Sequence, residues 1–230
     1  MWRDRKNPKK GAHSISESTA PVLSETKTTT GQRYLVFHKD LLNAVGDIRN
    51  SNVCVFIVYQ IKSEEGSSLT DERNFLISNN SEGTSVYFRG IYFLKGQSVL
   101  RIYTGTKDVG HDYFDRWVWE GSNPCTLKKW TVLCVEWVLN SNPNSTIMVD
   151  GRKICNFPAP GLAGSYTNFA IGNRSTIAPS IDGRDFRGCI DRVEIYKHNN
   201  GTWMPDAVKS AISVSLCRQY GIKPDIDDLL

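Results

Sequence analysis

Residues 130–139 read WTVLCVEWVL and residues 145–155 read STIMVDGRKIC, with the Asn-rich turn NSNPN between them. Apolar residues alternate along both stretches, which is the period-two pattern of a β-strand with one buried face. The stretches NFAIGNRS (168–175) and FRGCIDRVEIYK (186–197) follow, each preceded or interrupted by turn-forming glycine and asparagine or aspartate. This succession predicts an antiparallel sandwich and argues against a nucleotide-binding or helical fold.

Further strands are predicted upstream of this stretch. Residues 33–40 form a short strand, and NVCVFIVYQIKS (52–63) has an unbroken apolar centre, which is typical of a strand buried on both faces. Cys54 and Cys134 lie inside such apolar runs, so we expect both to be small buried side chains. Three more alternating segments, at 74–80, 85–94 and 98–105, are separated by Gly or Asn and predict hairpins.

One helix is predicted near the end of the chain. Pro205 and Asp206 suit its first turn, where proline loses no hydrogen bond and an acid favours the positive end of the helix dipole. Gly221 and then Pro224 end it. The residues that follow the i, i+3, i+4 spacing of one helical face are Val208, Ala211, Ile212, Ser215 and Leu216.

The chain divides by composition into an arm, one domain and a tail. Residues 1–31 are polar and poor in aliphatic side chains, which predicts a flexible arm or linker. Residues 32–223 hold the predicted strands and helix, and residues 224–230 form an acidic tail that we expect to be frayed. The length of 230 residues suits one sandwich domain with such extensions.

Several short motifs follow one another in this region: a tryptophan, VDG at 149–151, IG at 171–172, F-x-G-x-I-D-x-V-x-I-Y at 186–196, and then the helix. This order resembles the concanavalin A-like lectin/glucanase superfamily, and within it the laminin-G-like branch. The resemblance implies an all-β fold, an antiparallel two-sheet jelly-roll sandwich with one short C-terminal helix. It implies function only loosely, because function resides in sites built on a fold.

The resemblance also bears on catalysis. Glucanases of this superfamily carry catalytic carboxylates in a Glu-x-Asp-x-x-Glu pattern, and here Asp191 and Glu194 match its last two positions. Cys189 stands where the first glutamate would be, and a lone thiol does not replace that nucleophile. Being three positions apart, Asp191 and Glu194 are also expected to face opposite sides of a strand that has no bulge. We therefore expect no enzyme activity, and a glycoside hydrolase is the disfavoured alternative.

Six cysteines are present, and none forms a Cys-x-x-Cys pair, so a structural zinc site is not expected. Laminin-G-like domains commonly bridge the cysteine of their F-x-G-C strand to one near the C-terminus. The resemblance therefore suggests a disulfide between Cys189 and Cys217, while the lack of a visible secretory signal argues against one.

The segment at 105–125, GTKDVGHDYFDRWVWEGSNPC, is the first candidate for a binding site. It is long for a hairpin loop and dense in aromatic and acidic residues. Sugars stack on aromatic faces while carboxylates hold their hydroxyl groups. The candidate ligand-binding residues are Asp108, His111, Asp112, Tyr113, Asp115, Trp117 and Trp119. Trp117 and Trp119 alternate, so packing on the buried face of a strand is an equal alternative for both.

Calcium is the one cofactor that the sequence leaves open. Relatives in this superfamily use carboxylates on rim loops, and Asp182 and Asp185 in SIDGRDF are weak candidates for such ligands. Asp-Gly is also a common turn dipeptide, so no metal site is predicted from it.

Composition and charge argue against nucleic acid as a partner and against insertion into a membrane. A net charge of +4 and a charged share of 23% leave no basic stripe for nucleic acid, and no apolar segment is long enough to span a bilayer. No secretory signal is visible, which predicts cytoplasmic synthesis, or membership of a virion or extracellular assembly if the chain is a fragment.

The leading hypothesis is a non-catalytic recognition module that binds a glycan or a protein or cell surface, as the head of a viral or phage-like fibre or another adhesive assembly would. A structural domain that assembles into a homo-oligomer is the other alternative.

Overall fold

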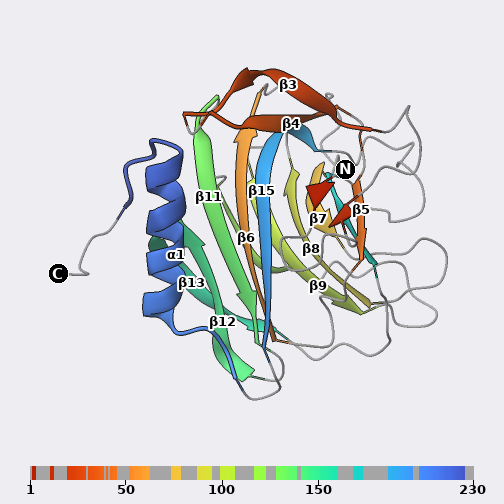
Figure 1. Cartoon of the computed structure of the whole chain (residues 1–230). Helices are drawn as coiled ribbons and strands as arrows, with labels where there is room; N and C mark the ends of the chain where they lie inside the picture. The colour runs from red at the N-terminus through yellow and green to blue at the C-terminus, as the bar shows by residue number, and fades with distance from the viewer. Residues whose placement is uncertain are drawn as a thin grey trace.

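The computed structural model describes residues 2–3, 11–12, 20–29, 31–38, 40, 42–45, 52–62, 74–78, 87–94, 99–106, 117–122, 128–138, 141–159, 168–172, 186–198 and 202–225. In this part of the chain, two large antiparallel sheets face each other, and one helix lies outside them (Figure 1). No helix there is both long and apolar enough to cross a membrane.

The first large sheet has six strands. Its order is β10 (Trp117–Ser122), β9 (Val99–Thr106), β8 (Tyr87–Leu94), β7 (Asn74–Ser78), β14 (Asn168–Ile171) and β5 (Leu42–Val45). The second has seven, in the order β13 (Arg152–Ala159), β12 (Ser141–Val149), β11 (Trp130–Trp137), β6 (Asn52–Ile61), β15 (Arg187–His198), β4 (Arg33–His38) and β3 (Val22–Lys27). The predicted sandwich of two antiparallel sheets with one helix is confirmed.

Strand β6 shows how the layers are held together. Its residues Val53, Val55, Ile57, Tyr59 and Ile61 belong to the apolar core between the two sheets. The intervening residues are buried on the outer face of the seven-stranded sheet, in a second cluster beneath the helix, and they are Cys54, Phe56 and Val58. The uninterrupted apolar run is therefore buried on both faces, as the sequence predicts.

The region expected to be a flexible arm is partly structured. Strand β3 pairs with β4 at the edge of the seven-stranded sheet, and β1 (Trp2–Arg3) pairs with β2 (Gly11–Ala12). An edge strand has one neighbour and one solvated side, so it needs few apolar residues, and a polar composition does not distinguish it from a linker. In β3, Ser24 is buried and its hydroxyl bonds to Thr26, while Val22 and Leu23 are exposed.

The helix α1 (Asp206–Gln219) begins after Pro205 as predicted, and Gly221 follows its end with a φ of +66°, a conformation that suits glycine. Of the residues spaced along one face, Leu216 is buried, and the other buried residues of α1 are Lys209, Ser210, Ser213 and Cys217. Leu216 and Cys217 join the apolar cluster on the sheet, whereas Lys209 meets the polar side chains of Glu136 and Thr146.

A buried ion pair joins α1 to the sheet. The Lys209 ammonium lies 2.5 Å from Glu136 Oε2 on β11, and both side chains are almost fully buried. Lys209 also donates to Thr146 Oγ1 at 2.6 Å, and its ammonium is 2.8 Å from Asp206 Oδ1. The other carboxylate oxygen of Glu136 accepts the backbone N–H of Met204 at 2.7 Å. The start of α1 is thus attached to the sheet by charge-assisted hydrogen bonds.

The electrostatic setting of Lys209 favours its charged form. Burial by itself would lower the pKa of Lys209, but the hydrogen bonds and negative charges of Asp206 and Glu136 outweigh burial and raise the pKa above its usual value. The ammonium is therefore charged at neutral pH, although it is buried.

Candidate functional site

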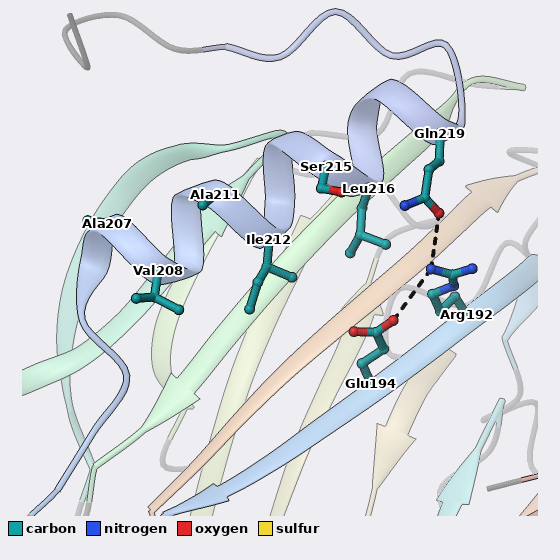
Figure 2. A pocket seen from close by; sticks show the side chains of 9 residues that line it. All are labelled: Arg192, Glu194, Ala207, Val208, Ala211, Ile212, Ser215, Leu216 and Gln219. Carbon is teal, nitrogen blue, oxygen red and sulfur yellow. Dashed lines mark hydrogen bonds and ion pairs between the residues drawn. The ribbon is translucent and has the colours of Figure 1, made fainter. Parts of the chain in front are cut away.

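An open groove runs between α1 and β15 on the outer face of the seven-stranded sheet, and its volume is about 570 Å³ (Figure 2). The helix supplies one wall and β15 supplies the floor. The lining residues are Arg192, Glu194, Ala207, Val208, Ala211, Ile212, Ser215, Leu216 and Gln219.

The helix wall of the groove includes the residues that the sequence places on one face of the helix. Val208 is 44% exposed, Ala211 is exposed and Ile212 is half-buried, whereas Leu216 is buried at the base of the wall. In Figure 2 the side chains of Val208, Ile212 and Leu216 point from the helix toward the sheet side of the groove. The helix therefore keeps its polar buried contacts with β11 and β12 and presents aliphatic groups to the groove.

The floor of the groove carries a paired cation and anion. The Arg192 guanidinium donates from Nη1 to Gln219 Oε1 at 3.1 Å and to Glu194 Oε1 at 3.5 Å (Figure 2). The other oxygen of Glu194 accepts the hydroxyl of Tyr196 at 2.8 Å. Burial, followed by this bond to Glu194, raises the pKa of Tyr196 to about 12, so its hydroxyl stays protonated and donates at neutral pH.

A β-bulge in β15 decides which residues reach the floor. The pairing of β15 with β6 shifts register between Ile190 and Arg192, so Asp191 is the extra residue. Asp191 accepts a short hydrogen bond from the Tyr220 hydroxyl in the cluster beneath α1. Asp191 and Glu194 were expected to face opposite sides only in a strand without a bulge, and the bulge found here turns both toward the outer face of the sheet.

These carboxylates are engaged with neighbouring side chains. Burial raises the pKa of Asp191, and the bond from Tyr220 and the charge of Arg192 offset only part of that rise. Glu194 is held by Arg192 and Tyr196. The floor therefore carries both a hydrogen-bond donor, Arg192, and an acceptor, Glu194, and can pair with a ligand that has both kinds of group.

Replacing Asp191 by asparagine tests this electrostatic setting. The folded-state pKa of Asp191 is raised, so its contribution to stability is present at low pH and is lost as pH rises through the folded pKa. We therefore expect wild type to gain stability relative to Asp191→Asn as pH falls from 7 toward 4, in urea unfolding at each pH. A difference that does not vary with pH would contradict the assignment, and Asp225→Asn, at an exposed ion pair with Arg152, is the control.

The suggested disulfide between Cys189 and Cys217 is not formed. Both are free buried thiols, and they contact different partners. Cys217 Sγ lies 4.0 Å from Asp150 Oδ1, whereas Cys189 lies beside Lys62. Burial raises the pKa of the Cys189 thiol to about 11 despite the lowering effect of Lys62, so this thiol is protonated at neutral pH. Cys54 and Cys134 are buried as predicted, with their sulfur atoms 3.5 Å apart.

Of the predicted binding residues, the structure describes only Trp117 and Trp119. Asp108, His111, Asp112, Tyr113 and Asp115 fall outside the described residues, as do the calcium candidates Asp182 and Asp185. Trp117 and Trp119 begin β10, and the register shifts between them. This strand is at the edge of the six-stranded sheet, whereas the groove is on the outer face of the other sheet.

The groove itself was missed from the sequence, although one signal for the bulge was there. The apolar residues Ile190, Val193 and Ile195 are spaced by three and then two, which breaks the alternation at the bulge. In the described part of the chain, no three His, Cys, Asp or Glu side chains are grouped so that they could hold a metal ion.

Comparisons with known proteins give a family and a fold. A family model described as the concanavalin A-like lectin/glucanases superfamily, of the laminin-G type, matches residues 65–199. No curated protein matches the sequence.

Three solved structures show the extent of the likeness in fold. A Trypanosoma rangeli sialidase mutant with trans-sialidase activity is 15% identical with a TM-score of 0.55, and the match covers 91% of this chain but only 30% of the sialidase. Domain 4 of an extracellular GH43 arabinanase from Geobacillus stearothermophilus, in complex with arabinotriose, is 13% identical with a TM-score of 0.51, over 91% of this chain and 88% of that one. The binding domain of Botulinum neurotoxin DC, in complex with rat synaptotagmin II, is 12% identical with a TM-score of 0.55, over 90% of this chain and 47% of that one.

Proposed function

The chain belongs to the concanavalin A-like lectin/glucanases superfamily, and we propose that within it the chain is a non-catalytic recognition module that binds carbohydrate. The superfamily includes both enzymes and binding domains, so the proposal rests on the residues of this chain.

The proposal that the chain is not an enzyme rests on the side chains of β15. Hydrolysis with retention needs an ionised carboxylate nucleophile close to a carboxylic acid. On this strand the residue two before Asp191 is Cys189, which is buried and protonated. Asp191 and Glu194 are tied to Tyr220 and to Arg192 with Tyr196. We infer that these groups stabilise the strand and the helix beside it.

Two observations support carbohydrate as the ligand. The arabinanase domain that shares the fold over most of its length is seen with arabinotriose. The segment 105–125 of this chain combines tryptophan and tyrosine rings with three aspartates and one histidine. We propose that the sugar site is formed by Asp108, His111, Asp112, Tyr113, Asp115, Trp117 and Trp119.

A glycan array probed with and without calcium tests this proposal. We expect a defined set of glycans to bind wild type, and Trp119→Ala to weaken that binding by about tenfold or more, since tryptophan side chains dominate many binding sites. Trp203→Ala is the matched control, because Trp203 is a tryptophan that is 47% exposed on another part of the molecule. Equal thermal midpoints would show that both variants fold.

Two results would contradict the proposal. Absence of glycan binding both with and without calcium would contradict carbohydrate as the ligand. Release of reducing ends from β-glucans by wild type, if Glu194→Gln abolishes it, would show that the chain is an enzyme and contradict the proposal that it is not.

A further inference from the structure

We propose that the groove between α1 and β15 is a second binding site, which takes a peptide segment of a protein partner that is aliphatic and carries no net charge. This proposal stands apart from the carbohydrate site, because it rests on other residues and on the other sheet.

The helix wall of the groove has the form of a peptide-binding surface. Val208, Ala211 and Ile212 recur at helical spacing, so they form one aliphatic stripe along α1, and the polar Ser215 continues it. Aliphatic stripes of this kind receive the apolar side chains of a docked segment. The nine lining residues include no aromatic ring, whereas sugar sites rely on ring stacking, so the wall favours a peptide over a glycan.

The charges of the floor select against anionic ligands. Arg192 and Glu194 compensate each other, and Asp191 lies next to them on the same side of the sheet. A phosphate, a sulfated sugar or an acidic peptide would therefore meet no excess of positive charge.

The floor can instead satisfy a peptide backbone. A guanidinium carries five N–H donors, and both of the hydrogen bonds that Arg192 makes with described residues leave from Nη1. Glu194 supplies acceptor oxygens beside these donors. A peptide backbone presents one acceptor and one donor per residue, so this pair matches it.

The groove is formed before a ligand arrives. The buried pair of Lys209 and Glu136 holds the start of α1, and at its end the Thr29 hydroxyl donates to the backbone oxygen of Gln219 at 3.0 Å. A wall held at both ends reduces the ordering cost of binding. The helix has 14 residues, so the wall is about 21 Å long, which is room for about six residues of extended chain.

The test uses the full chain and synthetic peptides of roughly six to twelve residues, a range set by the length of the wall. One set is aliphatic and neutral, a second is anionic and a third is cationic, and binding is followed by fluorescence anisotropy. We expect wild type to bind the neutral aliphatic set, and Val208→Asp to weaken that binding by about tenfold or more.

Val22→Asp is the matched control, because it makes the same replacement at an exposed valine on β3 and should leave peptide binding unchanged. If Val208→Asp lowers the thermal midpoint, Ala211→Glu repeats the test at an exposed helix position with a residue that favours helix.

Four outcomes would overturn the proposal. They are no binding by any peptide set, a preference for the charged sets, equal binding by wild type and the groove variants, or loss of glycan binding in Val208→Asp, which would assign the groove to sugars. The two proposed sites are distinguishable, because Trp119→Ala should leave peptide binding unchanged.

Discussion

Replacing Lys209 by methionine is expected to lower the free energy of unfolding by about 3–5 kcal/mol, the usual effect of removing one partner of a buried ion pair. The variant leaves the buried Glu136 carboxylate with the backbone N–H of Met204 and with no cation beside it. Urea unfolding at neutral pH measures the loss. Because the pKa of Lys209 is raised in the folded state, its stabilisation is complete below the unfolded pKa and is lost only as pH rises through the folded value.

Lys153→Met is the matched control for this prediction. Lys153 also pairs with Asp206, at 2.7 Å, but both side chains are more than a third exposed, so the expected loss is under about 1 kcal/mol. The double variant Glu136→Gln with Lys209→Met should recover much of the loss, since it removes the uncompensated charge and keeps an acceptor for Met204. Equal losses for Lys209→Met and Lys153→Met would show that the buried pair does not hold α1.

Replacing Gly188 by alanine is expected to lower the free energy of unfolding by about 2–3 kcal/mol. A Cβ at this position would lie 2.3 Å from the backbone oxygen of Gln60 on β6 and 2.6 Å from the ring of Phe186. The carbonyl belongs to the neighbouring strand of the ladder, so it cannot withdraw without disturbing the pairing of β15 with β6. Urea unfolding of the two forms gives the difference.

Gly90→Ala provides the comparison, because Gly90 also lies within a strand but its Cβ would be 3.3 Å from the nearest atoms. A shift of a few tenths of an ångström would admit it, and alanine restricts the unfolded chain more than glycine does. We expect a change of less than about 1 kcal/mol. Similar losses for Gly188→Ala and Gly90→Ala would mean that the close approach of β15 and β6 is not what requires glycine.

The fold was predictable because its main determinants are local. Alternation identified the strands, the apolar run of β6 identified a strand buried on both faces, and Pro205 with Gly221 bounded the helix. Each of these signals depends on a few neighbouring residues and needs no knowledge of tertiary contacts.

The candidate groove was not predictable in the same way, because its position depends on contacts between distant segments. The buried ion pair of Glu136 and Lys209 sets which face of α1 turns inward, and these residues are far apart in the chain. Apolar spacing alone therefore identified one face of the helix but not which of its residues are buried. The bulge at Asp191 left a trace in the spacing of Ile190 and Val193, but a single irregular interval does not separate a bulge from the end of a strand.

The place of β6 has a consequence for synthesis. It lies between β11 and β15, and well over a hundred residues separate β6 from β15 in the chain (Figure 1). At usual elongation rates this interval lasts roughly ten seconds, during which the edge of β6 that pairs with β15 has no partner. A nascent chain, or any fragment that stops before β15, exposes an aggregation-prone strand edge. Expression of this domain therefore depends on including β15 and on protecting β6 until β15 has emerged from the ribosome.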